Sequence, residues 1–196
     1  MDEKRPTLTR SCAAVLVVAA ALSLSTAGAA GSPSRDAANE RGGARAVAVS
    51  READLAHEIA AEINAVRRAR GLSSLRSSPL LGRAGSAHAT WLATAGSFTH
   101  DWPAGRPFSR WILGFYPATG YGQWTAGENL LWRSPAITSE EALALWLASP
   151  PHRRNLLSRA WHELGVAVVR ADGASGIYAP NDPVFVVAAE FGARSR

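Results

Sequence analysis

Cysteine and lysine are almost absent from this sequence of 196 residues, which has Cys12 as its one cysteine and Lys4 as its one lysine. Cys12 lies before a short apolar run, so loss of residues 1–30 would leave a protein without cysteine. Such a protein contains neither a disulfide nor a cysteine nucleophile, although small exported domains often depend on disulfides. Residues 31–196 must then be stabilised by one hydrophobic core, for which they are long enough.

Apolar runs long enough to span a bilayer are also missing. The longest run covers residues 12–24, which is shorter than the about 20 residues that a membrane helix needs. A basic start containing Lys4 precedes it, and small residues ending in Ala29-Ala30 follow it. This order is typical of a secretory signal peptide. We expect residues 1–30 to be removed near Ala29 or Ala30, and the exported protein to have no membrane span.

The charge pattern gives no sign of a nucleic-acid partner. After Ala30 the sequence has 18 arginines against 14 acidic residues, and the arginines are scattered. Their densest group, residues 67–70, ends a predicted helix, where positive charge suits the helix dipole. No basic face or base-stacking motif accompanies it. No P-loop, dinucleotide fingerprint, nucleophile elbow or zincin motif occurs either, so no local motif identifies an enzyme.

Apolar spacing and turn residues predict helices in the first part of the domain and strands in the last. Helices are expected over 53–70, 79–96, 107–113, 138–149 and 152–157, and strands over 129–132, 164–169 and 183–191. Thr138 and Glu141 fit a capping box. Residues 31–50 are small and polar, which predicts a flexible leader before a domain at 51–196. Helices first and a hairpin-like pair of strands last favour an α+β layered domain.

Three polar residues are candidates for chemistry. His100 and His152 each follow a predicted helix, and Glu128 falls between them in the sequence. Two imidazoles and a carboxylate that converge can bind a divalent cation or transfer protons. Their separations match no local ligand pattern, so three unrelated polar residues are the plainer interpretation of the spacing alone.

Two further polar residues receive structural interpretations. We expect His88 to be a hydrogen-bonded residue at the edge of the core. Glu190 lies near the end of an apolar strand, and a buried carboxylate needs a partner. We therefore expect Glu190 to face solvent, with a hydrogen bond near the candidate site as the alternative.

Five segments, in this order, resemble the bacterial branch of the CAP superfamily, which includes cysteine-rich secretory proteins, antigen 5 and plant pathogenesis-related class 1 proteins. They are INAVR at 63–67 with GL at 71–72, GSFTH at 96–100, GENL at 127–130, WLASPPHRRNLL at 146–157, and LGV at 164–166 with FG at 191–192. Each segment is weak by itself, but five in the family's order are specific. They extend from about Leu55 to Gly192.

The resemblance implies a three-layer α-β-α sandwich with a small antiparallel central sheet. It also implies that His100, Glu128 and His152 meet in one cleft, which binds Zn²⁺ in some family members. A second glutamate of the family falls here at Ser149. Loss of that charge should lower cation affinity, so Zn²⁺ at His100 and His152 is the weaker part of the expectation.

Other residues near these motifs have two interpretations each. Asn129 either orients Glu128 or satisfies loop backbone, and Ser149 is either a helix-end group or a weak site hydroxyl. Trp102 and Trp124 flank the site loops, where indoles either line a groove for a lipid or glycan or fill the core.

The expected function is an exported, monomeric binding module for a small apolar or cell-envelope ligand. His100, Glu128 and His152 would form its cleft. A metal-assisted or acid–base hydrolase using the same three residues is the first alternative. A non-catalytic structural or signalling protein of the cell envelope is the second, so the sequence leaves open whether the protein is an enzyme.

Overall fold

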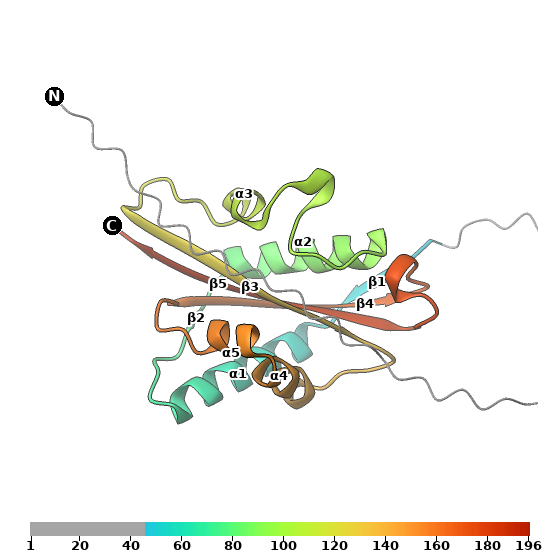
Figure 1. Ribbon diagram of the computed structural model, residues 1–196, viewed down its shortest axis with the longest axis horizontal. Helices are drawn as coiled ribbons and strands as arrows, with labels where there is room; N and C mark the ends of the chain where they lie inside the picture. Colours follow the sequence, from blue (N-terminus) through green and yellow to red (C-terminus); the bar gives the residue numbers. More distant parts are fainter. Residues whose placement is uncertain (1–45) are drawn as a thin grey trace, which may run out of the picture.

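A central sheet covered by helices on both faces forms the domain in the computed structural model, which describes residues 46–196 (Figure 1). One face carries α2 (Pro79–Ala95) and the short α3 (Phe108–Trp111). The other carries α1 (Ala53–Ala69), α4 (Ser139–Ala148) and α5 (Pro150–Leu156). This arrangement confirms the predicted α+β sandwich of three layers.

Four strands follow one another across the sheet in the order β1-β4-β5-β3. They are β1 (Ala48–Arg51), β4 (Glu163–Asp172), β5 (Val184–Ser195) and β3 (Gln123–Arg133). All these neighbours are antiparallel, and the two-residue β2 (Arg76–Ser77) pairs with β4 in parallel. Short 3₁₀ turns cover Pro103–Gly105, Ile112–Gly114 and Gly176–Tyr178.

Three strands are longer than the sequence predicts, among them β4, which continues to Asp172 rather than ending at 169. β3 begins at Gln123 rather than near 129, and β5 continues to Ser195 rather than ending at 191. The two strands pair along their whole length, from Gln123 with Ser195 to Arg133 with Phe185. Backbone pairing keeps the glycine-containing start of β3 extended, although its composition resembles a loop.

The first strand uses residues that composition assigns to the leader. β1 pairs with β4 from Ala48 opposite Asp172 to Arg51 opposite Val169. Residues 48–50 are therefore part of the sheet. The predicted signal peptide, 1–30, lies outside the described residues. Within residues 46–196, none of the helices has both the length and the apolar character required to cross a membrane.

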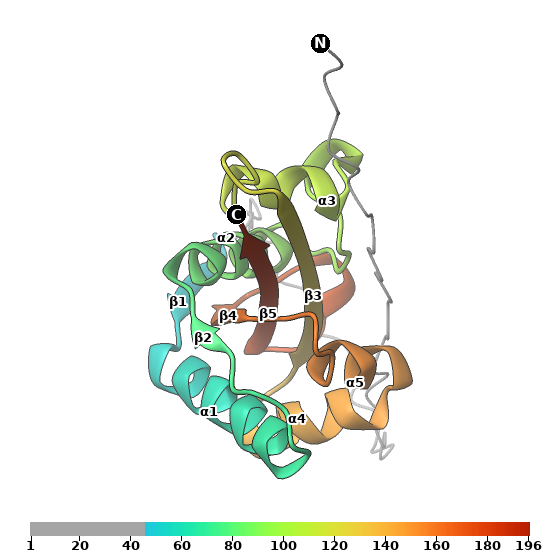
Figure 2. The same ribbon diagram turned by 90° about the vertical axis from the view of Figure 1, so that its left-hand side faces the viewer.

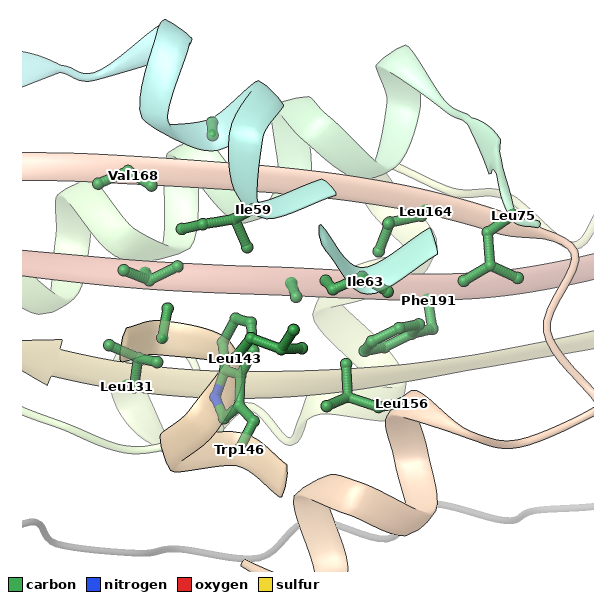
Figure 3. Packing of buried hydrophobic residues seen from close by; sticks show 14 of the residues in the cluster. Ile59, Ile63, Leu75, Leu131, Leu143, Trp146, Leu156, Leu164, Val168 and Phe191 are labelled. Atoms are coloured by element: carbon green, nitrogen blue, oxygen red, sulfur yellow. The ribbon is translucent and has the colours of Figure 1, made fainter. Parts of the chain in front are cut away.

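The layer of α1, α4 and α5 builds the larger core. Ile59 and Ile63 lie on the buried stripe of α1 that the sequence predicts, and Figure 3 shows Ile63 beside Phe191 of the sheet and Ile59 nearer to Val168. Trp146 of α4 joins the same cluster, and its indole N–H donates to the backbone carbonyl of Leu130 at 3.2 Å. Figure 2 shows α1 and α4 side by side beneath the sheet.

The layer of α2 lies close to the sheet because Gly165 has no side chain where the backbone of α2 crosses β4. A Cβ atom added to Gly165 of β4 would lie 2.1 Å from the backbone nitrogen of Gly82 in α2. One turn further along α2, a Cβ on Gly85 would lie 3.4 Å from Cγ of Glu190. This close approach brings the next turn of α2, which carries His88, onto the middle of the sheet.

Half of the predicted capping box forms at the start of α4. The Thr138 hydroxyl accepts a hydrogen bond from the backbone N–H of Glu141, as predicted. The Glu141 carboxylate does not reach back to the cap, because it accepts hydrogen bonds from the guanidinium of Arg133. Arg133 ends β3, so this ion pair ties the strand to the helix that follows it.

Candidate functional site

Glu128 is the centre of a buried polar cluster on the α2 side of the sheet. Glu128 lies on β3 between Gly127 and Asn129, and these two neighbours point to the opposite side of the sheet, toward Asn155 of α5. Its Oε1 lies 2.6 Å from Nδ1 of His88, and its Oε2 lies 2.6 Å from Nδ1 of His100. Glu128 is 3% exposed, and each of its two carboxylate oxygens contacts one imidazole.

Electrostatics keeps Glu128 ionised despite its burial. Burial by itself would raise the pKa of this carboxyl. The positive charge of His88 and the hydrogen bonds from His100 and His88 oppose burial and lower the pKa to about 2. Because an ionised carboxylate only accepts hydrogen bonds, both imidazoles donate from Nδ1.

Glu190 supplies a second carboxylate that the sequence places wrongly. It is fully buried, not solvent-facing, because β5 continues beyond it to Ser195 and it lies in the interior of the strand. It stands directly opposite Glu128 in the β3–β5 register. Burial, followed by the charge of Glu128, raises the pKa of Glu190 well above its usual value.

His88 is also more central than the sequence predicts. It is fully buried and hydrogen-bonded, as expected, but to the site carboxylate rather than at the edge of the core. Three indoles surround its ring, with centroid distances of 5.8 Å to Trp91, 5.6 Å to Trp102 and 4.7 Å to Trp111. The α2 side of the cluster is therefore enclosed by aromatic rings.

His152 comes from α5, in the helix layer on the other face of the sheet (Figure 1). It is 5% exposed, and its backbone carbonyl accepts a hydrogen bond from the Asn129 side chain at 3.1 Å. Asn155 bonds both to the side-chain oxygen of Asn129 and to the backbone carbonyl of Glu128. The structure thus joins His100 to Glu128 directly, and connects the backbone of His152 to them through Asn129 and Asn155.

The remaining predicted site residues have mainly structural surroundings. Asn129 satisfies backbone, the second of its two predicted roles, by binding the carbonyl of His152. Ser149 lies at the junction of α4 and α5, where its hydroxyl makes no capping hydrogen bond. Trp102 lies within the aromatic group around His88, whereas Trp124 packs on Tyr116 and donates to its backbone carbonyl at 2.9 Å.

Two surface hollows lie apart from this cluster. One of about 470 Å³ lies at the junction of α4 and α5 and includes Leu147 and Arg153. Another of about 310 Å³ lies between α1, the start of α2 and β4. Neither is lined by His100, Glu128 or His152. The buried cluster consists of His88, His100, Glu128 and Glu190, and His100 has the largest exposed fraction of the four, 7%.

A group of residues that could hold a metal ion is present, but it does not contain the predicted ligands His100 and His152. His88, Glu128 and Glu190 each offer a ligand atom, and these atoms all lie within 4.8 Å of one another. The position of the family's second glutamate, Ser149, supplies no carboxylate. A second carboxyl group comes from Glu190 of β5 instead, so the site keeps two acidic side chains.

The comparisons with known proteins agree with this fold. The family model described as the cysteine-rich secretory protein family, CAP, matches residues 60–189. An outer surface protein of Borrelia burgdorferi is similar in structure, with a TM-score of 0.55 and 21% identity over 70% of this chain and 90% of that one. An extracellular protein of Bacillus anthracis that contains an SCP domain is also similar, with a TM-score of 0.55 and 23% identity. That match covers 74% of this chain but 41% of the other. No curated protein matches the sequence.

Proposed function

This chain belongs to the CAP family of cysteine-rich secretory proteins, and we propose that it is an exported binding module for an apolar or cell-envelope ligand. One observation carries the proposal. The partly exposed indoles of Trp91 and Trp102 stack on each other beside the buried cluster of His88, His100 and Glu128. An apolar wall next to a few convergent polar groups is the usual composition of a ligand site.

The aromatic wall continues around Trp102. Its ring centroid lies 5.9 Å from that of Trp91, 5.2 Å from Trp111 and 6.3 Å from Phe115. Trp91 and Trp102 are half-buried, so one part of each indole packs while another part reaches the surface. Indoles combine a large apolar face with a polar N–H, which suits an amphipathic ligand. His100 would contact the polar end of such a ligand.

Two observations support export of the protein. The solved relatives are described as an outer surface protein and an extracellular protein. The sequence independently predicts a signal peptide over 1–30. We propose that this chain likewise acts outside the cytoplasm, as a monomer.

Replacing one indole tests the ligand site. We expect Trp102→Ala to weaken binding to phosphatidylglycerol vesicles or to insoluble peptidoglycan by roughly tenfold, equivalent to about 1.4 kcal/mol. The reason is loss of the central ring of the aromatic wall. Co-sedimentation measures the bound fraction.

Trp124→Ala is the matched control for this test, because it removes an indole of similar exposure that packs on Tyr116. Binding should survive in this variant. If the wild type binds one of the two probes, and neither Trp102→Ala nor His100→Gln changes its affinity, the proposed ligand site is incorrect. If the wild type binds neither probe, an envelope ligand of these two classes is excluded.

The second candidate function is hydrolysis, and the His100–Glu128 contact favours it. A carboxylate that accepts from Nδ1 fixes the tautomer in which Nε2 can remove a proton from water. Hydrolysis that is lost in a folded His100→Gln variant and retained in Trp102→Ala would support an enzyme. Absence of both binding and hydrolysis would leave a structural or signalling envelope protein.

A further inference from the structure

The buried group formed by His88, Glu128 and Glu190 has the composition of a metal centre. We propose that these three side chains bind one divalent transition-metal cation, with Zn²⁺ as the preferred ion. Their ligand atoms lie within 4.8 Å of one another. One imidazole nitrogen and two carboxylates form a ligand set that Zn²⁺ accepts. This centre differs from the His100–His152 pair that the family resemblance implies.

The surroundings of Glu190 contain no positive partner for an ionised carboxylate. The side chain is fully buried, and neither carboxylate oxygen accepts a hydrogen bond from a donor among residues 46–196. Burial, the charge of Glu128 and a hydrogen bond to the Glu128 carboxylate together raise its pKa. A Cβ on Gly85 would meet its Cγ together with the methyl groups of Ala167 and Ala188, so apolar groups enclose it there. No arginine forms an ion pair with it in the described part of the chain.

Two adjacent buried carboxyl groups are both ionised only if a cation lies between them, and without a cation one of them holds a proton. Glu128 and Glu190 stand opposite each other in the sheet register, and one oxygen of each lies within 4.8 Å of the other. A divalent cation neutralises both charges at once, whereas a proton neutralises one. The third ligand, His88, contacts Glu128 through Nδ1 at 2.6 Å, and a cation bound at this nitrogen would displace the proton of that hydrogen bond.

The residues around the three ligands are arranged as outer partners of a metal centre. His100 bonds to the second oxygen of Glu128, and Asn155 bonds to its backbone carbonyl. The first contact orients the carboxylate and the second holds the backbone that carries it, as partners of metal ligands do. The indoles of Trp91, Trp102 and Trp111 pack against His88 and limit access of water. His100 is the cluster residue with most exposure, so an ion would enter beside it.

Metal binding is measured with Zn²⁺ alone, so its outcome is independent of the proposed ligand. We expect the refolded, metal-free protein to retain about one equivalent of Zn²⁺ after gel filtration, measured by elemental mass spectrometry. In Glu190→Gln the affinity, measured by calorimetry, should fall about tenfold or more, since even outer partners of a metal contribute that much. Glu163→Gln removes a carboxylate of β4 outside the cluster and should bind as the wild type does.

Other results would contradict the proposed metal centre. Equal affinity in wild type and Glu190→Gln, or no Zn²⁺ retained by the wild type, would mean that a proton fills the place of the cation. Affinity lost in His152→Gln but kept in Glu190→Gln would put the ion at the pair implied by the resemblance. If Glu190→Gln does not fold, crystals of the wild type soaked in Zn²⁺ decide the question. An anomalous peak between Glu190 and His88 supports the centre, and its absence refutes it.

Discussion

Arg67 shows how this protein keeps a full positive charge in its interior without an acidic partner. The side chain is 1% exposed, and burial lowers the pKa of its guanidinium. Nη1 donates to the backbone carbonyls of Leu156 at 2.7 Å and Ser158 at 3.0 Å, and Nε donates to that of Ser73 at 3.0 Å. Arg67 therefore joins the end of α1 to the end of α5, the helix that carries His152.

Removing this side chain should destabilise the fold strongly. Arg67→Ala removes the donor from the buried carbonyl of Leu156 and from the part-buried carbonyls of Ser73 and Ser158, and it empties a buried site. A buried unsatisfied group alone costs about 1–3 kcal/mol. We expect the free energy of unfolding, measured in urea, to fall by about 3 kcal/mol or more. Arg68→Ala is the control, since Arg68 is exposed and bonds only to the exposed hydroxyl of Ser74. A loss of similar size in both variants would contradict this account.

At the scale of elements, the contact of α2 with β4 positions the cluster. Gly165 of β4 leaves room for the backbone of α2 at Gly82, and it also stands opposite Glu190 in the β4–β5 register. The helix can therefore lie low enough for His88 to reach Glu128. Larger side chains in this contact would lift α2 from the sheet and separate the imidazole from its carboxylate.

A pair of glycine substitutions tests this contact. Gly165→Ala would place a methyl group 2.1 Å from the nitrogen of Gly82, and such overpacking costs about 3 kcal/mol or more. Gly82→Ala puts its methyl group in open space within a helix, where alanine is favoured by about 1 kcal/mol. Thermal unfolding should show opposite shifts. Equal shifts would mean that α2 and β4 are not in close contact.

At the scale of the whole molecule, β1 and β3 are the two edge strands of the sheet path, and all four residues of β1 are exposed. β1 covers one side of β4, where Val169 and Ala171 are fully buried. On the outer edge of β3, the carbonyl of Glu128 accepts from Asn155 and that of Leu130 accepts from Trp146. Covered edges protect a sheet against pairing with another molecule.

Removal of β1 should therefore affect both stability and association. A variant beginning at residue 53 loses the ladder with β4 and the hydrogen bond from Glu52 to the carbonyl of Val168. Compared with a variant beginning at residue 46, we expect a loss of about 2 kcal/mol or more, because each hydrogen bond contributes about 1 kcal/mol. Gel filtration should show self-association. A monomer of unchanged stability would refute a structural role for β1.

Much of this architecture is predictable from sequence alone. The stripe of Ile59 and Ile63 fixes the buried face of α1, Pro79 and Gly96 bound α2, and the order of five short motifs identifies the family. Local composition could not give the ends of β3 and β5, because a strand extends as far as its partner pairs with it. Glycines in 120–127 therefore resembled a loop until the register with β5 was known.

The sequence by itself determined the layered α+β fold. Helix periodicity and turn residues are local signals, and the order of the motifs can be read along the chain without knowledge of contacts. Only the tertiary structure decided which polar residues meet. His100 and Glu128 were expected together, but Glu190 became their neighbour through the pairing of β3 with β5, and His88 through the glycine contact under α2. Such proximity depends on strand register and on the distance between layers, which no local pattern encodes.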